Sequence, residues 1–231
     1  MQEKSPLKID QFELGPMANY IYFISNEKTK DAYVVDPAWD SEFIYEQAQK
    51  QNLNLKGMLI THGHPDHTNG INALLKHIDI PVYVSLDEAS FYKPICENII
   101  DVKPGESLTM GDFEIKLLHT PGHTPGSQCF YIEAPSQTYH AGDHLEFVSK
   151  SIVISGDTLF LDGCGRCDLP GGNAEIMFDS IANILMKLPD ETVIFPGHNY
   201  HHQHCDCLSN QKKTNPYLQY DNLKQFIAKR M

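Results

Sequence analysis

The chain has 231 residues, a length at which sandwiches and α/β proteins often form one compact domain. Its formal net charge of −12 repels phosphate backbones and argues against a nucleic-acid partner. The first residues have no apolar signal core, and no stretch approaches the roughly 18 apolar residues of a membrane span. We therefore expect a cytoplasmic protein that does not contact membranes, with its six cysteines reduced or bound to metal.

The first half of the chain alternates β-rich runs with helical patterns. In chain order we expect paired strands over 18–25 and 31–36, a helix over 41–52, a buried strand over 57–61, a helix over 68–78, a strand over 81–85, a short helix over 86–93 and a further short segment over 98–102. This order predicts α/β layers that stack on one another.

The second half repeats the same rhythm. Strands are expected over 114–120, 127–133, 151–157 and 192–198, and a helix over 173–188 with Asn173 as its N-cap. The polar stretch 135–150 is expected to be an exposed hairpin or loop. Because no linker or fixed-period repeat interrupts the pattern, we predict one domain over 1–231 that ends in a short helical tail from about 208 to 231.

Four of the apolar strands end in side chains that can bind metals. The run over 57–61 continues as the segment THGHPDH, and the others lead to His123, Asp157 and His198. Loops at one edge of stacked sheets are the usual place for a functional site. Imidazoles and carboxylates together suit zinc, iron or manganese, and a bridging carboxylate can hold two metals about 3.5–4 Å apart.

These motifs resemble one known family. THGHPDH is similar to the HxHxDH signature of the metallo-β-lactamase fold, and HTPGHTPGS, SGDTLF and PGHNY follow in the order that this family shows, over roughly residues 17 to 200. The resemblance implies an αββα four-layer sandwich with a metal site at one edge. It also implies that His62, His64 and His123 bind one metal, that Asp66, His67 and His198 bind the other, and that Asp157 bridges them.

Residues near these motifs have supporting roles by the same resemblance. Asp36, in VVDPAWD, is expected to form hydrogen bonds beside the metal loop. His119 precedes the family's ligand position and is expected to be structural, and Ser127 is expected to support the loop of His123. No G-x-S-x-G elbow accompanies Ser127, so a serine hydrolase is not indicated.

The expected chemistry is metal-dependent hydrolysis. A divalent metal lowers the pKa of its bound water from about 15.7 toward about 7 and polarises a carbonyl group, so no protein nucleophile is required. Asp66 and Asp157 are the predicted catalytic residues. The expected cofactors are two divalent ions, zinc in the first place, with iron or manganese as alternatives.

Two branches of the family remain open. GDTLFLDGCGR resembles glyoxalase II, which hydrolyses a glutathione thioester, and implies a small-molecule thioester or thiol substrate that Arg166 and Asp168 help to bind. GCGRCD also resembles the persulfide dioxygenases, in which His62, His123 and Asp157 would hold a single iron. We place the hydrolase first and keep the dioxygenase as the alternative.

A third interpretation is a separate metal-binding module. Cys164 and Cys167, or Cys205 and Cys207 with His201, His202 and His204, could form a further zinc site. Because C-x-C is an uncommon zinc spacing, we prefer buried thiols and surface histidines. His140, Asp143 and His144 could also bind metal, but we favour a polar hairpin there.

Overall fold

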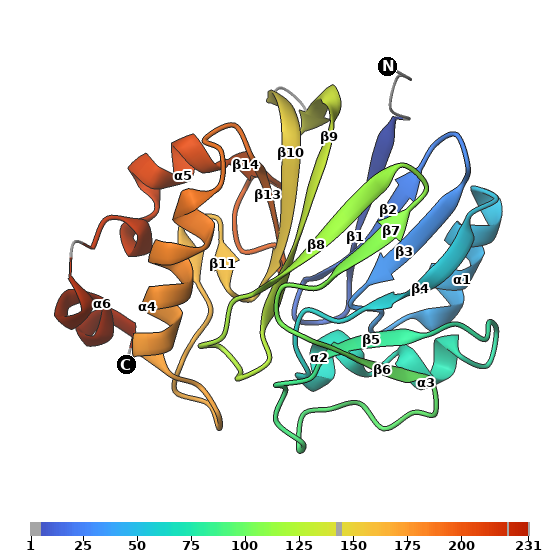
Figure 1. The fold of residues 1–231 in the computed structure, drawn as a ribbon, viewed down its shortest axis with the longest axis horizontal. Coiled ribbons are helices and arrows are strands. Elements are labelled where there is room, and N and C mark those ends of the chain that lie inside the picture. Colours follow the sequence, from blue (N-terminus) through green and yellow to red (C-terminus); the bar gives the residue numbers. More distant parts are fainter. Residues whose placement is uncertain (1–5, 142–144, 221, 231) are drawn as a thin grey trace.

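The computed structural model describes residues 6–141, 145–220 and 222–230, with the side chains of 229 and 230 left out. Two six-stranded sheets face each other in its centre (Figure 1). The first sheet runs in the order β1 (Leu7–Leu14), β2 (Asn19–Asn26), β3 (Asp31–Val35), β4 (Asn54–Leu59), β5 (Val82–Ser85) and β6 (Ile99–Val102). Its first three strands are antiparallel, and β3 to β6 are parallel.

The second sheet is built mainly from the second half of the chain. It runs in the order β14 (Asp206–Cys207), β13 (Val193–Pro196), β10 (Glu146–Gly156), β9 (Gln128–His140), β8 (Phe113–His119) and β7 (Ser107–Met110). Only β10 and β13 pair in parallel. A small ribbon of β11 (Leu159–Phe160) and β12 (Gly163–Cys164) lies beside it.

Helices cover the outer faces of the two sheets (Figure 1). They are α1 (Ser41–Lys50), α2 (Pro65–Thr68) and α3 (Ile71–Leu74) on the first side, and α4 (Ala174–Asn183), η1 (Leu185–Lys187), α5 (Leu208–Thr214), η2 (Pro216–Leu218) and α6 (Leu223–Arg230) on the second. This arrangement confirms the predicted αββα four-layer sandwich.

The alternation of side chains along the strands explains the layers. In β2, Tyr22 and Ile24 belong to the core between the sheets, whereas Ile21 and Phe23 pack toward the helices of the first side. Strands covered on both faces read as continuous apolar runs, as this one does. Since both sheets supply the central core, we retain the single domain over 1–231 as a proposal.

Most predicted elements form near their expected positions, with two corrections. The helix predicted over 68–78 is instead two short helices, α2 and α3, because Gly70 packs tightly against the preceding loop. A Cβ atom on Gly70 would lie 2.7 Å from the carbonyl oxygen of Pro37. The short helix predicted over 86–93 does not form, and turns replace it. There the buried carboxylate of Glu88 accepts hydrogen bonds from backbone N–H groups, which competes with helical hydrogen bonding.

The remaining outcomes concern the second half. Asn173 caps α4 by accepting hydrogen bonds from Glu175 N and Ile176 N, as predicted. The stretch 135–150 is the extended β9–β10 hairpin, although Tyr139 in it is buried. Its residues Asp143 and His144 lie outside the described part of the chain. None of the described helices is long and apolar enough to cross a membrane.

Candidate metal centre

The THGHPDH segment connects β4 to α2 at one edge of the first sheet. Pro65 is the first residue of α2, where its missing N–H costs no hydrogen bond, and His64 immediately precedes it. His62 and His64 point together from the extended part, and Asp66 and His67 follow on the helical turn. The local chain geometry therefore presents four candidate ligands within six residues.

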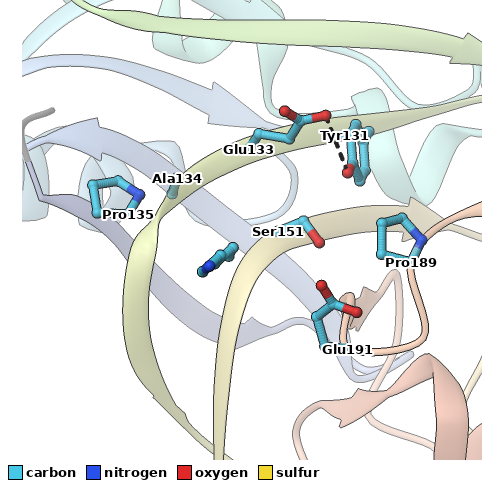
Figure 2. Close-up of a pocket in the computed structure, with 8 residues that line it drawn as sticks. Tyr131, Glu133, Ala134, Pro135, Ser151, Pro189 and Glu191 are labelled. Carbon is cyan, nitrogen blue, oxygen red and sulfur yellow. Dashed lines mark hydrogen bonds between the residues drawn. The ribbon is translucent and has the colours of Figure 1, made fainter. Parts of the chain in front are cut away.

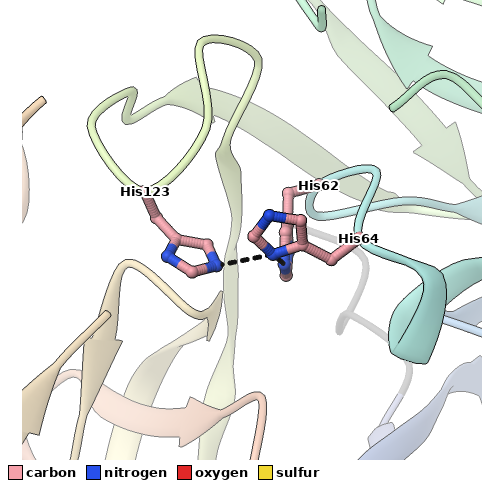
Figure 3. Close-up of side chains that lie close together, drawn as sticks. All are labelled: His62, His64 and His123. Carbon is pink, nitrogen blue, oxygen red and sulfur yellow. Dashed lines mark hydrogen bonds between the residues drawn. The ribbon is translucent and has the colours of Figure 1, made fainter. Parts of the chain in front are cut away.

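Three histidines from the two halves of the chain converge on one point (Figure 3). Nδ1 of His64 lies 3.0 Å from Nε2 of His62 and 2.9 Å from Nε2 of His123. Nδ1 of His123 donates a hydrogen bond to the carbonyl oxygen of Arg166 over 2.7 Å, which leaves the lone pair on Nε2 facing the other rings. Three nitrogen lone pairs that meet in this way suit a tetrahedral metal such as zinc.

A second group lies beside the first and combines Asp66, His67 and His198. The Nε2 atoms of His67 and His198 are 3.2 Å apart, and each is 3.5 Å from Oδ2 of Asp66. Nδ1 of His198 donates to the carbonyl oxygen of Met17 over 2.9 Å, so its Nε2 lone pair also faces the centre. This second group is a mixed imidazole and carboxylate donor set.

Asp157 lies between the two groups at the end of β10. Its Oδ2 is 3.5 Å from Nε2 of His123, and its Oδ1 is 3.3 Å from Nε2 of both His67 and His198. Each carboxylate oxygen thus faces a different group. Gly156, with φ +49°, and Gly197, where a Cβ would lie 2.5 Å from Oδ1 of Asp157, allow the backbone to come this close.

The donor chemistry fits a bound cation. Oδ1 of Asp157 is buried and, within the described residues, accepts no hydrogen bond, and Nε2 of His64 is in the same situation. A buried carboxylate oxygen without a donor is costly, and a cation between Asp157 and the facing rings would compensate for it. The seven ligands that the family resemblance implies are thus all brought together here.

The pKa directions show how strongly these groups interact. Burial and the neighbouring His123 lower the pKa of His64 to about 4, and burial and His67 lower that of His62 well below its ordinary value. Burial alone would lower the pKa of His67, but Asp157 and Asp36 outweigh it and hold that pKa high. Burial alone would raise the pKa of Asp157, but His67 and His198 hold it low. The carboxylates of Asp36 and Asp157 thus favour positive charge beside them, in the second ligand group.

Asp36 forms a hydrogen bond with a ligand of the second group, as the family resemblance suggested. It is buried, and its Oδ2 accepts a hydrogen bond from Nδ1 of His67 over 2.9 Å. Thr61 donates to the same carboxylate through its backbone N (2.7 Å) and its hydroxyl (2.6 Å). A carboxylate that holds the far nitrogen of a histidine is the usual arrangement behind a metal ligand.

Glu88 is a supporting residue that the sequence analysis did not identify. Its side chain is buried, and its Oε2 accepts hydrogen bonds from Gly63 N (2.9 Å) and from the hydroxyl of Thr124 (2.8 Å). It therefore joins the THGHPDH loop to the loop of His123. A lone acidic residue in a sequence carries no signal for such a role, because both partners are distant in the chain.

The residues predicted to be structural behave as expected. Nε2 of His119 donates to the carbonyl oxygen of Pro125 over 3.0 Å within the loop of His123. The hydroxyl of Ser127 accepts from the backbone N of Thr124 over 2.9 Å in the same loop. Neither residue belongs to the converging ligand groups.

The centre lies at the floor of a cleft of about 770 Å³. The ring of Tyr200 stacks on His198 with 4.7 Å between centroids, and Phe160 packs edge-on against Tyr200. Arg166 lies at the rim, where Nε and one terminal nitrogen each donate to the carboxylate of Asp168 over 2.7 Å. The cleft thus combines aromatic walls with the carboxylates and imidazoles of its floor, and a charged pair lies at its edge.

A second hollow, of about 590 Å³, opens between β9, β10 and the loop before β13 (Figure 2). Tyr131, Glu133 and Ser151 line it, and no histidine or cysteine of the described residues does. It has no group that could act as a metal ligand of the imidazole or thiolate kind. The cleft over the histidines is therefore the better candidate site.

The cysteine-based alternative finds no support in the described residues. None of the ligand groups brought together there includes a cysteine, or His201, His202 or His204. Burial raises the pKa of Cys205 to about 12, and His204 hydrogen-bonds the hydroxyl of Tyr20 at 2.7 Å. Exposed His140 pairs with Glu146 across the hairpin. These groups serve local structure.

Comparison with known proteins agrees with this geometry. A profile of the metallo-beta-lactamase superfamily matches residues 14–136 and 134–198. The chain is 32% identical to the "probable polyketide biosynthesis zinc-dependent hydrolase BaeB" of Bacillus velezensis, over 91% of this chain and 86% of that protein. It is 30% identical to the hydroxyacylglutathione hydrolase GloC of Haemophilus influenzae, over 82% and 88%. The crystal structure of ETHE1 from Myxococcus xanthus superposes with a TM-score of 0.79 and 28% identity, over 96% and 88% of the two chains.

Proposed function

Because the chain belongs to the metallo-beta-lactamase superfamily, we propose that it is a hydrolase with two bound divalent metals that cleaves a thioester or ester of a small thiol. The observation that carries the proposal is the position of Asp157. Its two carboxylate oxygens face two separate ligand groups, a position from which one carboxylate could be shared between two metals. Hydrolase names among the relatives support the same reaction class.

The proposed ligands are the residues that meet at the cleft floor. His62, His64 and His123 hold one metal, Asp66, His67 and His198 hold the other, and Asp157 contacts both. Zinc is the first choice, supported by the relative named as zinc-dependent. Bound metals would supply a hydroxide near neutral pH and would polarise a carbonyl oxygen.

The protein's own groups complete the proposed reaction. Asp66 and Asp157 face the cleft, and their carboxylates accept hydrogen bonds from the attacking water and orient it. Phe160 and Tyr200 form an aromatic wall on one side of the cleft, against which the substrate packs. At the rim, Arg166 binds the part of the substrate remote from the reacting carbon, and Asp168, which accepts two hydrogen bonds from Arg166, helps to position it. The predicted cytoplasmic location belongs to this proposal.

A persulfide dioxygenase with a single iron is the second candidate, favoured by the similarity to ETHE1 over nearly the full length of both chains. Two measurements separate the hydrolase from the dioxygenase. They are the metal content after expression in medium with defined metals and the rate of thioester hydrolysis under strict anaerobiosis. We expect close to two metals per chain and hydrolysis without oxygen. One iron per chain, with oxygen consumed when glutathione persulfide is added, would replace the hydrolase by the alternative.

A further inference from the structure

Asn19 is a buried polar residue that none of the site motifs contains. It is the first residue of β2, and its exposed fraction is 1%. Its backbone forms an isolated β-bridge with His198, and the neighbouring Tyr20 N donates to the carbonyl oxygen of Gly197 over 2.8 Å. The start of β2 is therefore held directly against the loop that presents His198.

The side-chain amide of Asn19 has a defined orientation. Nε1 of Trp39 donates a hydrogen bond to Oδ1 of Asn19 over 2.9 Å. Because an indole N–H can only donate, the amide must turn its oxygen to Trp39 and its nitrogen the other way. Nδ2 of Asn19 then donates to Oδ2 of Asp66 over 3.0 Å and lies 3.4 Å from Nε2 of His67.

Trp39 is itself held in place. Its backbone N donates to Oδ1 of Asn69 over 2.7 Å, and its own φ is +67°. The ring lies against Gly15, where an added Cβ atom would be 2.4 Å from the indole. A non-glycine residue at φ above zero persists only where its surroundings determine it, so the indole position is set by several independent contacts.

These contacts form a chain of hydrogen bonds from an indole, through an amide, to a carboxylate. The carboxylate, Asp66, is the one acidic member of the second ligand group, whereas the first group consists of histidines. A carboxylate turns about its bond more freely than the two imidazoles of this group, because Nδ1 of His67 bonds Asp36 and Nδ1 of His198 bonds the carbonyl oxygen of Met17. The hydrogen bond from Asn19 to Oδ2 of Asp66 fixes the rotation of the carboxylate. This rotation determines which oxygen lone pairs of Asp66 point to the second ligand group.

We propose that Trp39 and Asn19 are positioning residues that orient the Asp66 carboxylate and thereby set the affinity of the second metal alone. This inference rests on the proposed two-metal function. It assigns the control of one of the two metal affinities to a single hydrogen-bond chain. Trp39 is the single tryptophan of the sequence, so its fluorescence reports directly on this chain.

The test is a Zn²⁺ titration of the metal-stripped protein, followed by calorimetry and, where Trp39 is retained, by its fluorescence. In the wild type we expect two binding steps, with the fluorescence change in the step assigned to the Asp66 group. Trp39→Phe keeps a ring against Gly15 but removes the N–H donor. We expect it to weaken the second step by about 10–100-fold and to leave the first unchanged.

Asn19→Leu removes the amide and should reproduce that selective loss. Tyr20→Phe is the matched control, because its hydroxyl in the same strand bonds His204 and not the ligands. Unchanged second-step affinity in both Trp39→Phe and Asn19→Leu would overturn the inference and leave the two-metal function intact. Equal weakening of both steps would also overturn it, because it shows a general structural role. A single step in the wild type would overturn the two-metal function and this inference with it.

Discussion

His67 donates from Nδ1 to Oδ2 of Asp36 over 2.9 Å while its Nε2 faces the second ligand group. The imidazole is thus held by one nitrogen and offers the other. A buried carboxylate in this position fixes the ring and makes its free nitrogen a better ligand. The relationship connects β3, which ends just before Asp36, to α2, which carries His67.

Replacing this carboxylate should weaken metal binding. For Asp36→Asn we expect a loss of about 10–100-fold in the affinity of the metal bound by His67, measured by competition with a fluorescent chelator. Thr61→Val is the comparison for the metal bound by His67, because it removes a hydroxyl from the same carboxylate but leaves the bond to His67. It also removes the 3.1 Å contact of that hydroxyl with Nδ1 of His62, which belongs to the other ligand group. Equal effects of the two variants would argue that Asp36 serves only to hold the loop.

Metal removal should destabilise the fold as well as abolish activity. The converging histidines and Asp157 are buried, and without a cation their lone pairs face one another. We expect a lower melting temperature after chelation, recovered by adding Zn²⁺, in differential scanning calorimetry. Equal melting temperatures of the stripped and loaded protein would contradict the ligand assignment.

Single ligand substitutions should separate the two metals. His64→Ala is expected to lose the metal of the three-histidine group, and His198→Ala the other, each with severe loss of hydrolysis. Asp157→Ala should weaken both, because its two oxygens face both groups. Metal content per chain, measured by elemental analysis after gel filtration, checks all three. Full metal content and turnover in Asp157→Ala would refute its shared role.

Arg166 should affect substrate binding more than chemistry. Its side chain is more than half exposed and pairs with Asp168 at the rim, while its backbone carbonyl, which any substitution keeps, accepts from His123. We expect Arg166→Lys to raise KM for a glutathione thioester with little change in kcat for a small activated ester. Steady-state kinetics on both substrates tests this, and equal losses on the two would place Arg166 in the chemistry or the fold.

Glu88 should contribute to stability through the two loops that it joins. Glu88→Ala leaves Gly63 N and the hydroxyl of Thr124 without their buried acceptor, which we expect to cost about 1–3 kcal/mol in the free energy of unfolding. Urea denaturation of the metal-free protein measures it. Glu114→Ala, in which an exposed carboxylate is removed, is the control and should change little. A Glu88→Ala variant as stable as this control would refute the role of Glu88 in joining the two loops.

Features that depend on neighbouring residues could be predicted from the sequence alone. The apolar runs predict the strands because both faces of each sheet are covered, and Asn173 caps its helix through contacts two and three residues away. The spacing within THGHPDH predicts that His62 and His64 point the same way from an extended segment, and that Asp66 follows on the turn into the helix. The resemblance of the motifs then supplied the distant members, His123, Asp157 and His198.

Features that depend on residues far apart in the chain could not be predicted in this way. The predicted helix over 68–78 is divided at Gly70 because the carbonyl oxygen of Pro37 lies close to this residue. The predicted helix over 86–93 does not form, and Glu88 there accepts hydrogen bonds from Gly63 and Thr124. The amide of Asn19 reaches Asp66 only because the first sheet places the start of β2 beside α2. Such contacts have no sequence period, since each arises from packing between elements. They determine how firmly the ligands are held, whereas the local pattern determines which residues they are.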